Sequence, residues 1–110
     1  MTSFMENFAR KADAAGAKSD PRVTRVLQLL RDGVNATTEE QIRITEIPAP
    51  PFQESARAAY MKKSLASTGL RVQTDETGNV IGEWPGCSPD VVMLTAHLDT
   101  VFPPGTDVRV

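Results

Sequence analysis

The chain has 110 residues, enough for one small domain, and its 40% hydrophobic and 24% charged residues are typical of a globular protein. The formal net charge is -2 at pH 7, and the lysines and arginines are scattered, which argues against a nucleic-acid-binding protein. A single cysteine, Cys87, excludes an internal disulfide framework, and no apolar run approaches the roughly 20 residues of a membrane span. We therefore expect a cytoplasmic protein that binds neither nucleic acid nor membranes.

Two helices are predicted in the first third of the chain. Ser3 and Glu6 fit a capping box that would begin the first helix, with a frayed terminal tail as an equal alternative. Asp20 and Pro21 suit the start of the second helix, and Gly33 follows its end. Apolar residues recur at helical spacing on one face of this second helix, which predicts an amphipathic helix with a core face: Val23, Val26, Leu27, Leu30 and Val34.

A third helix is predicted to begin at another capping box, in which Thr37 and Glu40 are partners. It should end at about Glu46, because the residue that precedes Pro48 is restricted to extended backbone. The prolines of residues 48–51 then predict a stiff extended connector.

A fourth helix followed by a β-hairpin is predicted next. The helix should run from residue 52 or 53 to about Thr68, and Gly69 fits the left-handed position that ends it. Hydrophobicity then alternates over residues 70–74 and returns over residues 80–84, with turn-forming residues between.

Residues 91–96 are continuously apolar rather than alternating, which predicts a central strand covered on both faces. Residues 106–110 begin another alternating strand. Nothing in the sequence covers the second face of the central strand, so we expect a fragment cut inside its first domain.

His97 is the only histidine of the chain, and it leaves the carboxyl end of the predicted central strand. Open α/β sheets bind ligands at this edge, and a neutral imidazole suits Zn²⁺ or Co²⁺. A metal-binding histidine needs an acceptor for its second ring nitrogen, and Asp99 is within reach. The spacing alone is weakly specific, and a lone histidine is more often structural or solvated.

The block from Val91 to Pro103, with the sequence VVMLTAHLDTVFP, resembles the first metal-site motif of the M20 metallopeptidases. In that family an apolar strand runs into His-x-Asp-Thr-Val. The proline loop at residues 44–50 and the helix and hairpin before the block are also similar to elements of the family. The resemblance extends from about Thr37 to Val110.

The resemblance implies an α/β fold, the amino-terminal part of a zinc-peptidase catalytic domain, with helices followed by a β-hairpin and a buried central strand. It implies a two-zinc enzyme that hydrolyses a peptide or N-acyl amino acid bond, with Co²⁺ also suited to the ligands. His97 matches the first zinc ligand, and Asp99 matches the catalytic carboxylate that orients it. The family's lid domain commonly carries a dimer contact, which implies a homodimer for the full-length protein.

The family's other metal ligands and its general-base glutamate follow this block in the family, and this chain lacks them. We therefore expect a helical segment at residues 1–36, an incomplete catalytic domain at residues 37–110, and no activity from this chain alone. The alternative is a non-catalytic remnant or binding module, and a general scaffold would leave the placement of His97 and Asp99 as coincidence. Cys87 is interpreted as a free thiol in a turn rather than a nucleophile.

Overall fold

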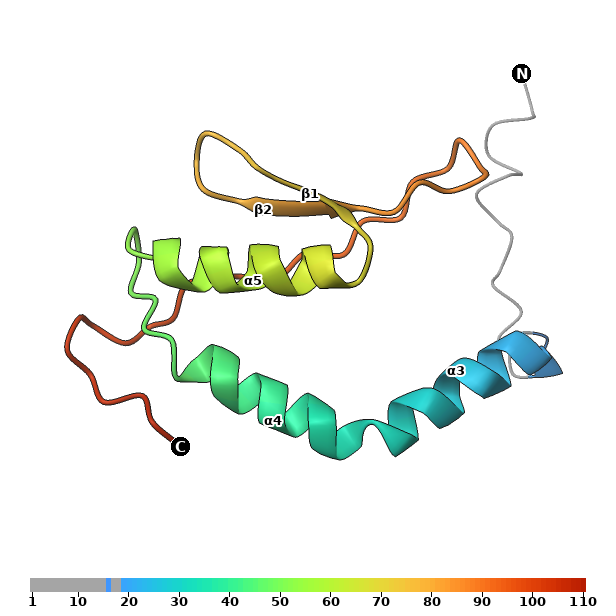
Figure 1. Cartoon of the computed structure of the whole chain (residues 1–110), viewed down its shortest axis with the longest axis horizontal. Coiled ribbons are helices and arrows are strands. Elements are labelled where there is room, and N and C mark those ends of the chain that lie inside the picture. Colours follow the sequence, from blue (N-terminus) through green and yellow to red (C-terminus); the bar gives the residue numbers. More distant parts are fainter. Residues whose placement is uncertain (1–15, 17–18) are drawn as a thin grey trace, which may run out of the picture. The chain divides into compact units, whose positions relative to one another are not determined.

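A computed structural model describes Gly16 and residues 19–110 (Figure 1). The chain divides into two compact units, Met1–Glu39 and Glu40–Val110. The described elements are helices α3 (Pro21–Asp32), α4 (Val34–Thr45) and α5 (Ser55–Ser67), then strands β1 (Arg71–Thr74) and β2 (Val80–Glu83). None of the helices in this described part is long and apolar enough to cross a membrane. The helix predicted to begin at Ser3 lies outside the described residues.

Helix α3 begins and ends where its sequence predicts. The Asp20 carboxylate accepts the backbone N–H of Arg22 at 2.8 Å, which satisfies a donor at the open end of the helix. Pro21 occupies the first turn, where its missing N–H costs nothing. Gly33 closes the helix by donating its N–H to the Leu29 carbonyl at 3.0 Å. The predicted bounds of this helix are confirmed. The core face expected for its apolar residues is not, because Val26, Leu27 and Leu30 are 44–63% exposed and no residue of α3 is buried.

Helix α4 begins at Val34, directly after Gly33, rather than at the predicted capping box. Gly33 has φ -88° and ψ 2°, so the backbone turns into the next helix without a loop. Thr37 lies inside this helix, and its hydroxyl donates to the Gly33 carbonyl at 3.0 Å. Threonine makes this bond within helices, and it replaces the capping interaction. The predicted start was therefore wrong, whereas the end at Thr45 agrees with the prediction.

Helix α5 starts slightly later than predicted, at Ser55. Phe52 has a positive φ of 65°, a left-handed conformation that interrupts a helix, and its N–H donates to the Glu54 carboxylate at 2.6 Å. At the other end Gly69 has φ 86°, the left-handed conformation that the sequence predicts there.

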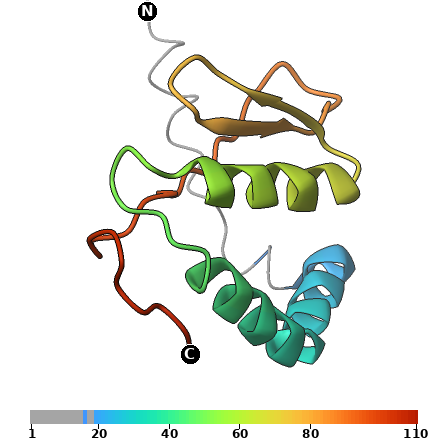
Figure 2. The ribbon, with the colours of Figure 1, turned by 60° about the vertical axis from the view of Figure 1, so that its left-hand side comes forward.

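The β-hairpin is confirmed, and α5 runs along one of its faces in both views (Figures 1 and 2). The strands are antiparallel, with Arg71 opposite Glu83. A Cβ added at Gly82 would lie 3.2 Å from a methyl of Leu70 and 3.5 Å from a methyl of Leu65. The missing side chain thus gives these two leucines room between the helix and β2.

The predicted central strand at residues 91–96 is absent from the structure, and the strand predicted at residues 106–110 is absent too. A strand needs hydrogen-bonding partners, and no described residue pairs with either segment. The side chains from Val91 to Leu94 are 77–94% exposed rather than buried. The described part is therefore a mixture of helices and a two-stranded sheet, without the buried central strand.

Burial is concentrated near the start of α5. Within the described part, the buried residues are Ala49, Pro50 and Arg57. Ala49 and Pro50 belong to the connector between α4 and α5, which comprises residues 46–54, and Arg57 lies in the first turn of α5. The connector and this turn form the part of the structure against which the His97 segment lies.

Candidate metal-ligand site

His97 and Asp99 lie in a loop, which we call the anchored loop (residues 97–100). The Nδ1 atom of His97 is 3.2 Å from a carboxylate oxygen of Asp99, a hydrogen-bonding distance. The imidazole is 94% exposed, whereas the carboxylate is 39% exposed. With Nδ1 engaged by the carboxylate, Nε2 is the ring nitrogen that remains for a ligand. The structure thus brings together the two residues that the sequence predicts as a pair.

The backbone around Asp99 is hydrogen-bonded on both sides. Before it, the carbonyl of Leu98 accepts from Nη1 of Arg57 at 2.9 Å. After it, the N–H of Thr100 donates to the Ala49 carbonyl at 2.8 Å, and Ala49 is buried. The anchored loop is therefore tied to the connector and to α5, and these segments lie side by side in both ribbon views (Figures 1 and 2).

Arg57 is the one charged side chain among the buried residues of the described part, with 6% exposure. Its Nε and Nη2 atoms donate to the Ile47 carbonyl at 3.1 and 2.6 Å, and Nη2 also reaches the Thr45 carbonyl at 3.3 Å. The carbonyls at the end of a helix have no helical partners, so the guanidinium supplies donors where α4 ends. Backbone carbonyls, rather than a carboxylate, satisfy this buried cation.

Arg57 was not among the site residues predicted from the sequence. A signal existed, because Met61 and Leu65 follow it at spacings of one and two helical turns. A cation on the apolar stripe of a helix is expected to be paired when it is buried. Only the structure shows that its partners are backbone carbonyls brought from the connector and from the anchored loop.

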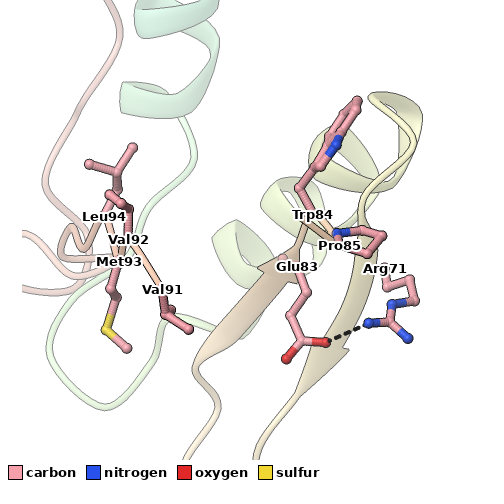
Figure 3. Close-up of a pocket in the computed structure, with 9 residues that line it drawn as sticks. Arg71, Glu83, Trp84, Pro85, Val91, Val92, Met93 and Leu94 are labelled. Carbon is pink, nitrogen blue, oxygen red and sulfur yellow. Dashed lines mark ion pairs between the residues drawn. The ribbon is translucent and has the colours of Figure 1, made fainter. Parts of the chain in front are cut away.

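A separate shallow groove of about 360 Å³ lies between the hairpin and the segment of residues 91–94, which we call the apolar segment (Figure 3). Trp84 and Pro85 lie on the hairpin side, near the ion pair of Arg71 with Glu83 at 3.6 Å. His97 does not line this groove. The groove and the histidine pair are therefore distinct features of the second unit.

The residues present fit one corner of a zinc site. An accessible imidazole whose second nitrogen meets a carboxylate is the usual environment of a zinc-binding histidine. Structural and catalytic zinc sites use three or four protein ligands. No group of three potential metal-binding side chains occurs among the described residues. Cys87 is a free, exposed thiol, as predicted.

Comparison with known proteins places the chain near a group of hydrolases. No family model matches the sequence. It is 36% identical over 69 residues to a protein named putative LysW-lysine/LysW-ornithine hydrolase from Pyrococcus furiosus. It is 41% identical over 64 residues to LysW-lysine hydrolase from Deinococcus radiodurans, and 26% identical over 78 residues to ureidoglycolate hydrolase from Arabidopsis thaliana.

These matches cover 59%, 58% and 63% of this chain. They cover a much smaller share of the relatives, 21%, 17% and 16% of their lengths in the same order. The chain thus spans about a fifth of the length of the curated relatives that it matches. The shared stretch supports the conclusion that the chain is similar, over more than half of its residues, to proteins named as hydrolases.

Proposed function

We propose that this chain forms the amino-terminal part of an M20-type, zinc-dependent hydrolase that cleaves a peptide or N-acyl amino acid bond. The observation that carries the proposal is the hydrogen-bonding contact of 3.2 Å between His97 Nδ1 and Asp99. The partial similarity to named hydrolases supports the same class of reaction. In the proposed domain organisation, residues 1–36 form a helical segment and residues 37–110 form the start of the catalytic domain.

In the proposed site His97 binds zinc through Nε2, and Asp99 keeps the proton on Nδ1. A carboxylate in this position fixes the tautomer of the ring and raises its basicity. Zinc bound by His97 would supply Lewis-acid chemistry for the hydrolysis. Because one histidine is a single ligand, the proposal requires the remaining ligands, a second zinc ion and a general-base glutamate from outside the described residues.

The proposed substrate class follows from the M20 resemblance and from the names of the relatives. Two relatives are named for the hydrolysis of LysW-lysine, and another for ureidoglycolate. LysW-lysine is therefore the first substrate to test, followed by N-acyl amino acids and dipeptides. The proposal also places the enzyme in the cytoplasm as a homodimer.

The test is hydrolysis by the protein expressed from its complete reading frame. We expect zinc-dependent activity in the wild type and none in His97→Ala, because that change removes a ligand. Asp99→Asn should keep part of the zinc and lose roughly 10–100-fold in kcat, as removing the partner of a metal-bound histidine usually does. Asp90→Asn, in an exposed loop, is the matched control and should behave as the wild type.

Full activity in His97→Ala would refute the assignment. A folded wild-type protein that takes up no zinc and hydrolyses no member of the substrate panel would instead favour the non-catalytic binding module. Both outcomes are measured with the same preparations.

A further inference from the structure

We propose that Arg57 is a positioning residue, which fixes the backbone from which Asp99 orients His97. This inference rests on the proposed function, because it describes how the metal ligand and its carboxylate are held. Arg57 touches neither side chain, and it acts through the peptide group between Leu98 and Asp99.

The geometry of the peptide group explains how a distant guanidinium has this effect. The group is planar, so a hydrogen bond to its oxygen or its N–H restrains the Cα atoms at both ends. The bond from Arg57 to the Leu98 carbonyl restrains the peptide group before Asp99. The bond from Thr100 to Ala49 restrains the one after it. The Cα atom of Asp99 therefore lies between two restrained peptide groups.

Both restraints lead back to the same structural element, the connector after α4. Ala49 is 1% exposed in this connector. Arg57 reaches the connector through the Ile47 carbonyl, at 2.6 Å from Nη2, and the end of α4 through the Thr45 carbonyl. One guanidinium thus links three carbonyls from two segments that are distant in sequence. Thr45 and Ile47 belong to the end of α4 and the connector, and Leu98 belongs to the anchored loop.

Only a guanidinium can make this set of bonds. Its donors point in different directions within one rigid plane, so Nη1 reaches the anchored loop while Nε and Nη2 reach the connector. A lysine ammonium concentrates its three donors on one atom and cannot present this fork. Substitution by lysine therefore keeps the charge while removing the geometry.

The orientation of the exposed His97 imidazole depends on the position of Asp99. His97 is 94% exposed, and its hydrogen-bonding partner in the described part is Asp99. A shift of the Asp99 backbone is therefore passed to the carboxylate and from there to the ring. Metal affinity depends on this orientation, since partners of metal-binding histidines change affinity or activity when they are altered.

The test compares Arg57→Lys with the wild type in the protein expressed from its complete reading frame. We expect the zinc dissociation constant to rise and kcat to fall by roughly 10-fold each, the low end of the range for direct partners of metal ligands, because Arg57 acts one contact further away. KM should change much less than kcat, because Arg57 does not contact substrate in this scheme. Lys62→Arg, an exposed position on the same helix, is the matched control and should change neither constant.

The outcomes separate this inference from the function on which it rests. Wild-type protein that binds zinc and hydrolyses substrate, with the same zinc affinity and kcat in Arg57→Lys, overturns the role of Arg57 alone. Wild-type protein that takes up no zinc overturns the proposed function and the positioning role with it. A changed circular dichroism spectrum in Arg57→Lys would show a folding defect. The inference is then tested on the wild-type protein alone.

In that case hydrogen exchange in the folded wild-type protein decides the matter. We expect the Thr100 amide and the Arg57 Nε–H to exchange roughly 100-fold more slowly than unprotected groups, because both are hydrogen-bonded to the connector. Unprotected exchange at both groups overturns the inference without any variant.

Discussion

The anchored loop and the apolar segment are close in sequence, yet they meet the rest of the second unit in opposite ways. In the anchored loop, the backbone of Leu98 and Thr100 is hydrogen-bonded to Arg57 and Ala49. In the apolar segment, Val92 and Leu94 are 88% and 94% exposed. The backbone of the anchored loop has hydrogen-bonding partners within the described residues, whereas the backbone of the apolar segment has none there.

The difference follows from the kind of interaction each region needs. A directional hydrogen bond requires one donor at the right place, and Arg57 supplies several from a single side chain. Burial of an apolar strand requires area on both faces together with partners for its backbone. An unpaired apolar segment is also a template for association with other chains. The loop is therefore hydrogen-bonded within the described part, whereas the predicted strand does not form there.

The largest effect on stability is predicted for Arg57→Ala in this chain. This substitution removes the hydrogen bonds that tie the anchored loop to α5 and the connector. The substitution leaves part-buried carbonyls without their charged donor, and it should lower the free energy of unfolding by about 3 kcal/mol. Urea unfolding followed by circular dichroism measures the change. Lys62→Ala, on the exposed side of the same helix, should stay within about 0.5 kcal/mol of the wild type.

A loss below about 1 kcal/mol in Arg57→Ala would show that the hydrogen bonds of Arg57 contribute little to stability. Water would then replace the guanidinium without penalty, and the anchored loop would be no better held than the apolar segment.

A smaller effect is predicted at the hairpin loop, which is exposed like the apolar segment but hydrogen-bonded like the anchored loop. The Asn79 side-chain amide at 2.7 Å, its backbone N–H and the Thr77 hydroxyl lower the pKa of Asp75 from the ordinary 3.8 to about 2. A lowered pKa means that this stabilisation is complete above pH 4 and is lost as the pH falls through about 2. Asp75→Asn should lower the thermal midpoint at pH 7 and flatten its decline between pH 4 and 2.

Glu76→Gln, which removes one carboxylate from the same turn, controls for the change in charge. An identical pH profile for Asp75→Asn and the wild type would show that the hydrogen bonds of Asp75 do not stabilise the hairpin.

The smallest effect on stability is predicted for Val92→Lys in this chain. Its side chain is 88% exposed, so the free energy of unfolding should stay within about 0.5 kcal/mol of the wild type. Self-association should decrease, because a charge interrupts the apolar segment. Sedimentation velocity measures the association, and Lys63→Glu serves as a surface control. Marked destabilisation by Val92→Lys would contradict the exposure of this segment.

Local signals in the sequence were enough for most of the elements. The cap at Asp20, the left-handed glycine at Gly69 and the alternating strands each depend on neighbours a few residues away. The start of α4 was missed because Gly33 keeps a near-helical backbone, and composition does not reveal this. The apolar run at residues 91–96 indicates burial, but burial depends on partners that lie elsewhere.

The candidate site was predictable in part for the same reason. His97 and Asp99 are close in sequence, so their pairing could be predicted from spacing, and the structure places them 3.2 Å apart. Arg57 is far from Leu98 in the sequence, and its link to the anchored loop depends on the path of the connector. No local pattern encodes a contact of that kind. The metal role of the pair stays a prediction.

The most direct test of the proposed metal role is the zinc content of the protein expressed from its complete reading frame, measured after dialysis for the wild type and His97→Ala. We expect the wild type to retain zinc and His97→Ala to lose at least one ion per chain while keeping its circular dichroism spectrum. Equal zinc content in the two proteins, or a folded wild type without zinc, would contradict the proposed metal role.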